Sequence, residues 1–417
     1  MRLHRRLPDH WRIGIAGVMA IGVTFGFARY GYGLFLPEIR REFGLSMSLV
    51  GMVASATYLG YLLALTLVGT LVSRLGPRPL IITGGLAATA GMAMVAFAGS
   101  TPPLVIGLIL AGTSSGWAWA PYSDAVDQAL PPQRRERVLA LLPSGTAFAT
   151  AIAGPLALLA AGAAWRYAWM AFALIALAVT AYNARVLPRR AAPARAPTQI
   201  PARNVPVWDL GWSLRRDAVP LYLTAFSYGL GGAVYWAFAG DAVTKATGVQ
   251  EAAPLFWTLM GAAGISGVLT GALTERLGLR RTHTLLVGAL ATAVALLGAA
   301  SGSWAAGSVA PGAWGAIATS AVLYGSAFMA GSGLLAVWSY RVFPDRPSAG
   351  FSATVFFLGI GTIVGPTALG IVADHHGLRV AFVLTTLILA ATALARPRHK
   401  PADAGGDREM ATSRLDG

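Results

Sequence analysis

Arg29 is the residue whose position most clearly suggests chemistry, because it lies inside an apolar stretch. Residues 13–28 contain no charged side chain, and the apolar stretch continues after Arg29 to Leu36. Charged residues within membrane-spanning segments are rare, and they face a bundle interior or a water-filled cavity. The planar guanidinium group also matches carboxylates and phosphates. The preferred interpretation is therefore that Arg29 binds an anionic group of a ligand. Two alternatives remain, a side chain that reaches the nearer membrane surface and a fixed ion pair.

Aromatic residues form the second group that could contact a ligand. Phe25, Arg29 and Tyr32 share one face of a helix by their spacing. Rings and hydroxyl groups in a cavity can stack on a solute or bind it by hydrogen bonds, although each ring taken alone can equally be a packing residue. The residues that we expect to bind substrate are Arg29, Phe25, Tyr32, Trp117, Tyr228, Trp236 and Tyr324.

A coupling proton and a metal ion each have one candidate position. Asp124 lies one helical turn before Asp127 at the end of an apolar stretch, so it is a candidate proton site, with a structural role as the alternative. His375 and His376 follow Asp374, but a metal site would need a further ligand in the right place. A solvated turn is the preferred interpretation, and no metal or other cofactor is expected.

The sequence also lacks patterns that would indicate catalysis or ATP-driven transport. It contains no cysteine, no H-E-x-x-H metalloprotease pattern and no P-loop G-x-x-x-x-G-K-[ST] pattern. Thiol chemistry and nucleotide hydrolysis by this chain are therefore not expected. A membrane-embedded enzyme remains a remote alternative.

The composition is that of a polytopic membrane protein. Hydrophobic residues make up 55% of the chain, charged residues 12%, and the mean hydropathy is +0.61. Soluble domains contain about 25% charged residues. Twelve apolar stretches are long enough to cross about 30 Å of hydrocarbon as helices, which predicts an all-α membrane protein. They lie near residues 13–36, 47–71, 79–99, 103–126, 138–162, 166–187, 219–240, 252–273, 282–302, 312–338, 349–373 and 379–395.

The basic residues are distributed unevenly along the chain. The net charge is +15, but 26 of the 32 Lys and Arg residues lie before the first stretch, in the even-numbered loops or in the tail. Excess Lys and Arg marks cytoplasmic loops, so both termini are predicted to be cytoplasmic, and the charge does not indicate nucleic-acid binding. The arginines before the first stretch also resemble a signal peptide, but the many later spans favour an uncleaved first span.

The spans divide into two repeated sets of six. GTLVSRLGPRP at residues 69–79 is matched by GALTERLGLRR at residues 271–281, and each follows an even-numbered span. The predicted organisation is an N-terminal six-helix bundle over residues 1–187, a cytoplasmic linker over 188–218, a C-terminal six-helix bundle over 219–396 and a disordered cytoplasmic tail over 397–417.

These features resemble the major facilitator superfamily over nearly the whole chain. That family carries G-x-x-x-[DN]-[RK]-x-G-x-[RK] after its second span, and here Ser73 takes the place of the first acid. The resemblance implies two pseudo-symmetric bundles of six helices, whose loops latch together on the cytoplasmic side. Asp127 is the natural partner for Arg74 or Arg78. The implied cytoplasmic gate consists of Gly69, Ser73, Arg74, Gly76, Arg78, Asp127, Gly271, Glu275, Arg276, Gly278 and Arg280.

The resulting prediction is a secondary active or facilitative transporter of the bacterial inner membrane. It moves a small organic solute by alternating access, and Arg29 favours an anionic solute. The expected partners are this solute and the lipid bilayer, with a coupling proton left open, and the chain is expected to act as a monomer. The alternative, favoured by the aromatic residues, is a proton-coupled exporter of amphiphilic drugs or metabolites.

Overall fold

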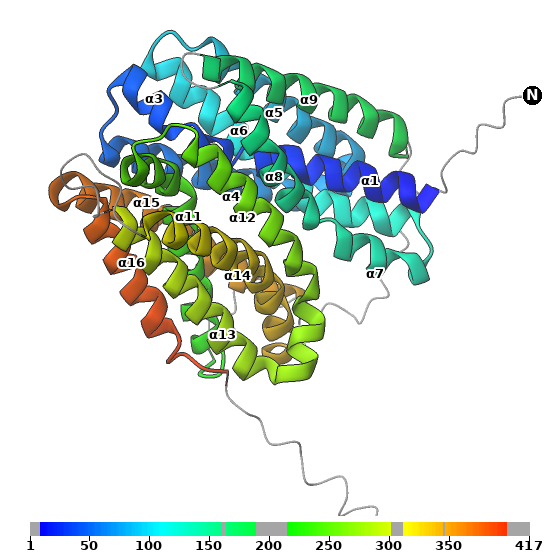
Figure 1. Ribbon diagram of the computed structural model, residues 1–417. Coiled ribbons are helices and arrows are strands. Elements are labelled where there is room, and N and C mark those ends of the chain that lie inside the picture. The colour runs from blue at the N-terminus through cyan, green and yellow to red at the C-terminus, as the bar shows by residue number, and fades with distance from the viewer. Residues whose placement is uncertain (1–8, 161–163, 189–214, 302–311, 345–346, 398–417) are drawn as a thin grey trace, which may run out of the picture.

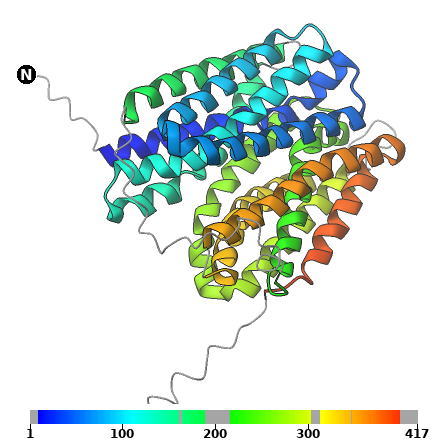
Figure 2. The ribbon, with the colours of Figure 1, turned by 180° about the vertical axis from the view of Figure 1, so that it is seen from behind.

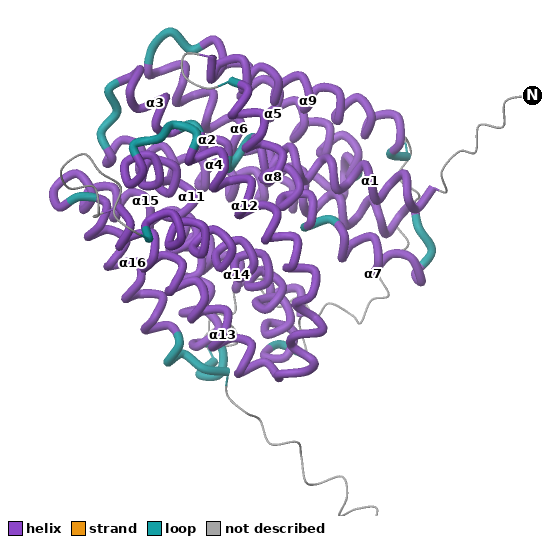
Figure 3. Tube along the Cα trace, viewed as in Figure 1, coloured by secondary structure: helices purple, strands orange, loops and turns teal. Residues whose placement is uncertain are grey.

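The computed structural model describes residues 9–160, 164–188, 215–301, 312–344 and 347–397. Within these ranges the regular elements are helices, and no strand occurs (Figure 3). The predicted linker and tail lie almost entirely outside the described residues, so both stay predictions.

The first half of the chain contains a broken first span and five further spans. The first span comprises α1 (Asp9–Ile21), the π-helix η1 (Gly22–Phe27) and α2 (Gly31–Leu34), and the short α3 (Leu36–Phe43) follows it. The other helices are α4 (Met47–Leu75), α5 (Pro77–Phe97), α6 (Thr101–Ala129), α7 (Pro132–Leu141), α8 (Ser144–Leu159) and α9 (Trp165–Val186). The predicted start of the fifth span at residue 138 was too early, because a break around Pro143 separates α7 from α8.

The second half repeats this plan. Its helices are α11 (Val219–Thr247), α12 (Ala252–Gly264), the 3-10 helix η3 (Ile265–Leu269), α13 (Thr270–Ser301), α14 (Ala313–Val342), α15 (Pro347–His376) and α16 (Leu378–Thr392). Gly278 leaves the helical region inside α13, with φ 74° and ψ 158°. The eighth span therefore ends there, and the rest of α13 is the ninth span.

The described helices account for all twelve predicted spans. Eight helical stretches are long and apolar enough to cross a membrane, and one of them, residues 252–301, contains the two spans that Gly278 separates. Helices α8 and α16 are apolar but shorter. Helix α11 is the remaining span. It has 29 residues but is not among the eight stretches that are both long and apolar enough to cross a membrane. Most of its residues are buried against protein, so they do not need to be as apolar as residues that face lipid.

The two halves form bundles that converge at one end and diverge at the other (Figures 1 and 2). They converge where α3 leads into α4 and where α15 leads into α16, and we call this the α3 end. They diverge at the opposite end, which carries the N-terminus and α7, and we call this the α7 end. Most contacts between the halves come from α4 with α15, α8 with α12, and α2 with α11, and α3 also contacts α11.

Glycines bring facing helices of the two halves into backbone contact near the α3 end. A Cβ atom on Gly51 of α4 would lie 2.0 Å from the carbonyl oxygen of Pro366 in α15. A Cβ atom on Gly154 of α8 would lie 2.3 Å from the carbonyl oxygen of Pro254 in α12. No side chain fits at these positions, so the closed α3 end depends on glycine.

The two repeated loops have the same backbone geometry. Gly76 between α4 and α5 has φ 75° and ψ 170°, and Gly278 in the corresponding turn has φ 74° and ψ 158°. Residues other than glycine rarely adopt a positive φ of this kind. The repeat that the sequence predicts is therefore confirmed at the level of the backbone.

A buried polar network fixes the helices of the first half around α1. The Tyr122 hydroxyl makes two contacts. It donates to the carbonyl oxygen of Ile13 at 3.1 Å, and it lies 3.0 Å from Asn183 Oδ1. The Asn183 amide nitrogen donates to the carbonyl oxygens of Ala16 and Val179, at 3.1 and 3.0 Å. These contacts connect α1, α6 and α9 without a charged group.

Replacement of Asn183 by alanine is expected to lower the stability of the protein. The substitution leaves the Tyr122 hydroxyl and two backbone groups with fewer partners in a buried place, and such losses cost about 1–3 kcal/mol each. The measurement is the apparent melting temperature of the detergent-purified protein. The exposed residue Gln128 of α6 gives the control, because Gln128→Ala removes no buried contact. An unchanged melting temperature in Asn183→Ala would contradict this role.

Candidate functional site

The first span is broken at the place where Arg29 lies. In η1 the backbone follows a wider, π-helical course, and the amide of Ala28 donates to the carbonyl oxygen of Val23 at 2.9 Å. Close packing against α8 accompanies this course, since a Cβ atom on Gly26 would lie 2.3 Å from the Cβ atom of Ala149. Irregular helices of this kind are frequent at functional sites and at the binding sites of transporters.

The guanidinium group of Arg29 points toward α4 and α6. Its Nη1 donates to the Ser115 hydroxyl at 3.3 Å, and its Nε is buried without a hydrogen-bond partner among the described residues. No carboxylate of the described residues lies within 4 Å of it. This geometry does not favour the fixed ion pair or the side chain that reaches the membrane surface. A half-buried cationic group with a buried, unused donor is suited to bind an anion.

Aromatic rings form a cage around Arg29. The guanidinium carbon lies 4.2 Å from the ring centre of Tyr61, 4.4 Å from that of Tyr58 and 5.4 Å from that of Phe25. At these distances the ring faces attract the positive charge. Phe25 was predicted as a site residue from the sequence, but Tyr58 and Tyr61 of α4 were missed. Their spacing of three residues is the only signal for them, because it places both on one helix face.

A second aromatic group extends from Arg29 across the boundary between the halves. The ring of Tyr30 stacks on Trp236 of α11 with centres 4.0 Å apart, and Trp236 meets Tyr324 of α14 edge to face at 5.8 Å. Arg29 lies 5.9 Å from the ring centre of Tyr30. Two of the predicted site residues, Trp236 and Tyr324, are thus connected to Arg29 through Tyr30, which the sequence reasoning did not include.

Tyr228 and Tyr324 are both buried in the second half. Tyr228 stacks on Phe328 at 4.8 Å and donates its hydroxyl to the carbonyl oxygen of the same residue. Tyr324 also stacks on Phe328 and donates its hydroxyl to the carbonyl oxygen of Gly232 at 3.0 Å. Their hydroxyl groups are therefore used inside the protein, and a role of either residue in substrate binding stays a prediction.

Two other predicted site residues, Trp117 and Tyr32, are not among the described rings that surround the guanidinium group of Arg29. Trp117 packs toward α5, because a Cβ atom on Gly84 would lie 2.9 Å from the Trp117 Cβ. Trp119, two residues further, meets Phe25 edge to face at 5.3 Å and is 36% exposed. Tyr32 is buried in α2, and its hydroxyl has no hydrogen-bond partner among the described residues. Of the two tryptophans of α6, Trp119 is therefore the one that contacts Phe25 beside Arg29, and a role of Trp117 or Tyr32 in substrate binding stays a prediction.

Replacing the two tryptophans of α6 one at a time is expected to separate binding from stability. Trp119→Ala removes a partly exposed ring beside Phe25, so it is expected to weaken ligand binding several-fold and to leave the melting temperature nearly unchanged. Trp117→Ala removes a packing contact between α5 and α6, so it is expected to lower the melting temperature instead. Both quantities follow from thermal-shift titrations, and the opposite pattern would contradict this placement of the two rings.

The predicted gate residues lie at the α7 end, where the halves diverge. Arg78 donates to the carbonyl oxygen of Ala184 at 2.7 Å, and Asp127 pairs with Arg135 at 3.4 Å. Both contacts stay within the first half. The other charged residues of the predicted gate are exposed in both halves, namely Arg74, Glu275, Arg276 and Arg280. A latch between the halves would need the α7 ends to meet, so it stays a prediction for another conformation.

The candidate proton and metal positions lie outside the Arg29 site. Asp124 is half-buried one turn before Asp127, near the α7 end. His375 and His376 are exposed at the α3 end. Among the described residues, no three His, Cys, Asp or Glu side chains gather closely enough to hold a metal ion.

Two acids of α3 have shifted pKa values. Burial raises the pKa of Glu38, and its Oε2 has no hydrogen-bond partner among the described residues. Burial also raises the pKa of Glu42, but hydrogen bonds from Arg166 and Trp165 outweigh this effect and bring the pKa below its ordinary value. The protonated form of Glu38 is therefore favoured by its burial.

The fold defines the class of protein, a membrane transporter built from two six-helix halves. A family model described as the Major Facilitator Superfamily matches residues 18–295, and the chain belongs to this superfamily. Its members are transporters rather than enzymes, and they bind small-molecule substrates within the membrane.

Known proteins resemble the chain to different extents. The transcription regulatory protein OpdE of Pseudomonas aeruginosa is 29% identical over 388 residues, which cover 90% of this chain and 91% of that protein. Monocarboxylate transporter 13 of Rattus norvegicus is 27% identical over 194 residues, 45% of this chain and 44% of that protein. A crystal structure of a mutant of the nucleoside transporter NupG has a TM-score of 0.73 at 11% identity and covers 93% of this chain and 98% of that one.

Proposed function

We propose that the protein transports a small organic anion and binds it at Arg29. The observation that carries the proposal is the half-buried guanidinium group of Arg29 inside a span, with a buried, unused Nε donor and without a paired acid among the described residues. A cation in such a place is costly, and an anionic solute that completes its hydrogen bonds would lower this cost. Alternating access of the two halves would then carry the solute across the membrane.

The charge around Arg29 favours a solute with one negative charge. The other basic residues of the described spans lie at span ends, far from the middle of the first span. A monoanion would neutralise the single guanidinium group, whereas a dianion would leave one uncompensated charge in a poorly hydrated place. The rings of Phe25, Tyr61 and Trp119 favour an apolar body next to the charged group. The partial similarity to a monocarboxylate transporter supports the same solute class.

The orientation in the membrane follows from the distribution of basic residues. Most Lys and Arg residues belong to the termini and to the loops of the α7 end, so we propose that this end faces the cytoplasm of a bacterium and that the α3 end faces outward. The chain contains no cysteine, so single cysteines can be introduced without background labelling. A membrane-impermeant thiol reagent applied to intact cells is expected to label Ser100→Cys and to spare Leu75→Cys. The reverse result would contradict this orientation.

Two other functions have some support. The partly exposed ring of Trp119 favours an exporter of amphiphilic compounds, driven by a coupling proton that Asp124 or Glu38 would carry. The similarity to OpdE, which is named a transcription regulatory protein, favours a membrane-bound regulator that binds a solute without moving it. We also propose a monomer as the active unit, which size-exclusion chromatography with light scattering tests.

A thermal-shift panel tests the proposed solute class. The purified protein is heated with butyrate, benzoate, succinate, butyramide or tetraphenylphosphonium. A ligand at 100 times its Kd stabilises the folded state by about 2.7 kcal/mol, which raises the melting temperature. We expect butyrate or benzoate to raise it and the neutral amide and the dianion to have little effect. Stabilisation by tetraphenylphosphonium alone would contradict the anion site and favour the exporter.

A further inference from the structure

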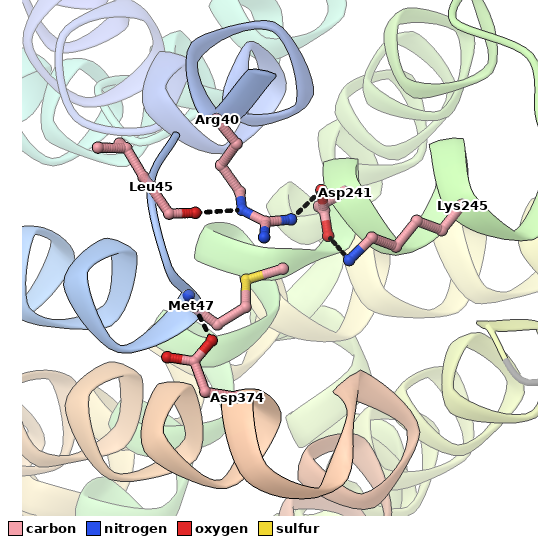
Figure 4. Close-up of polar contacts among 6 residues, drawn as sticks. All are labelled: Arg40, Leu45, Met47, Asp241, Lys245 and Asp374. Carbon is pink, nitrogen blue, oxygen red and sulfur yellow. Dashed lines mark hydrogen bonds and ion pairs between the residues drawn. The ribbon is translucent and has the colours of Figure 1, made fainter. Parts of the chain in front are cut away.

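The first turn of α4 is capped by the other half of the protein. The first backbone amides of a helix have no partner within the helix. In α4, the Ser46 hydroxyl of the same half accepts from the amide of Leu49 at 3.1 Å. The carboxylate of Asp374, at the end of α15, accepts from the amide of Met47 at 2.7 Å (Figure 4). It also accepts from the amide of Ser48 at 2.7 Å and from the Ser48 hydroxyl. The cap is complete only while the two halves are in contact at the α3 end.

A second charged contact joins the halves nearby. Arg40 of α3 pairs with Asp241 of α11 through Nη1 at 2.9 Å, and its Nε donates to the carbonyl oxygen of Leu45 (Figure 4). The other carboxylate oxygen of Asp241 lies 2.8 Å from the Lys245 ammonium group. Asp241 is 4% exposed, so its charge depends on these neighbours rather than on water.

Both contacts have the same arrangement. The acids, Asp241 and Asp374, come from the second half, and the groups that they bind, Arg40 and the start of α4, come from the first half. When the α3 end opens, Arg40 must leave Asp241, and Asp374 must leave two amides of α4. Lys245 differs, because it is on the same helix as Asp241, four residues later, and moves with it.

We propose that these two contacts form a latch that sets the resting conformation of the protein, with the α3 end closed. A contact shifts a conformational equilibrium only to the extent that it differs between the two states. The Arg40–Asp241 and Asp374–α4 contacts exist in one state, whereas the Lys245–Asp241 contact exists in both. The latch therefore consists of Arg40, Asp241 and Asp374, and Lys245 does not contribute to it. This inference concerns the protein without a ligand and does not depend on the proposed solute.

The test measures the distance between the halves at the α3 end. Spin labels are placed on Ser100→Cys in the first half and Val249→Cys in the second, both exposed, in the cysteine-free chain. Distances are recorded without ligand by pulsed electron paramagnetic resonance. In Arg40→Gln and in Asp374→Asn, the ratio of long to short distances is expected to rise about tenfold. The loss of a hydrogen bond to a charged group changes an equilibrium constant by about this factor.

Two matched variants make the result specific. Lys245→Gln removes a cation from the same carboxylate, and Glu251→Gln removes an exposed acid at the same end. Both are expected to leave the distances near those of the wild type. The proposal is overturned if Arg40→Gln and Asp374→Asn also leave them unchanged, or if Lys245→Gln opens the α3 end as strongly as Arg40→Gln. Asp374 is exposed, so Asp374→Asn is expected to fold and gives a result even if Arg40→Gln does not.

Discussion

Replacement of Arg29 by alanine is expected to weaken anion binding strongly with little change in the melting temperature of the free protein. Truncating one partner of a buried charge pair costs about 2 kcal/mol or more, so the Kd for the solute should rise at least about 30-fold. The melting temperature of the free protein should change little, because the cost of holding a cation there, with its Nε unpartnered and no paired acid among the described residues, offsets its contacts with Ser115 and the tyrosine rings. Isothermal titration calorimetry gives the Kd for the solute, and a thermal-shift assay gives the melting temperature of the free protein.

The lysine variant tests whether the shape of the guanidinium group matters as well as its charge. Arg29→Lys keeps the positive charge but loses the planar fork that binds both oxygens of a carboxylate. We expect the Kd to lie between those of the wild type and Arg29→Ala, about tenfold above the wild type. A fall of many degrees in the melting temperature of Arg29→Ala, together with an unchanged Kd, would mean that Arg29 is a structural residue.

Replacement of Gly33 by alanine is expected to hold the α3 end open and to stop transport. A Cβ atom on Gly33 of α2 would lie 1.8 Å from the carbonyl oxygen of Trp236 in α11, and Gly240 of α11 is in similar contact with the carbonyl oxygen of Gly33. These atoms belong to rigid helices of different halves, so the clash is relieved by moving the halves apart. Each half keeps its own packing, and the spin-label distance between residues 100 and 249 should become mainly long.

Gly31 provides the control for this prediction, two residues earlier in the same short helix. A Cβ atom there would lie 3.6 Å from the Trp169 ring of the same half, which is an ordinary van der Waals contact. Gly31→Ala should therefore transport and show the distances of the wild type. If Gly33→Ala also kept the wild-type distances, the contact between α2 and α11 would not limit the closure of the α3 end.

Much of the fold could be predicted from the sequence, because the membrane imposes strong rules on it. Spans must be long and apolar, and basic residues collect at particular loops, so the twelve spans and the repeat were predictable. The family resemblance was confirmed. The errors concern places where a helix meets protein instead of lipid or where it breaks. Examples are the early start predicted for the fifth span and the π-helix before Arg29.

The site was harder to predict, because the apolar face of a span looks the same toward lipid and toward the bundle interior. Arg29 and Phe25 stood out by charge and spacing, and Trp236 and Tyr324 by residue type. The choice between Trp117 and Trp119 depends on the rotation of α6 against α5, which the sequence does not encode in a readable pattern. Tyr58 and Tyr61 were missed because α4 has no charged residue inside the span, and small polar residues such as Ser55 and Thr57 do not by themselves mark the face that meets a ligand.

Uptake by proteoliposomes tests the central claim most directly. Wild-type protein and Arg29→Ala are reconstituted in parallel, and the uptake of the radiolabelled monocarboxylate that most raises the melting temperature is followed over time. We expect saturable uptake by the wild type and uptake by Arg29→Ala equal to that of protein-free liposomes. Equal uptake by both proteins would contradict the anion site at Arg29, and binding without any uptake by the wild type would contradict transport and favour a regulator.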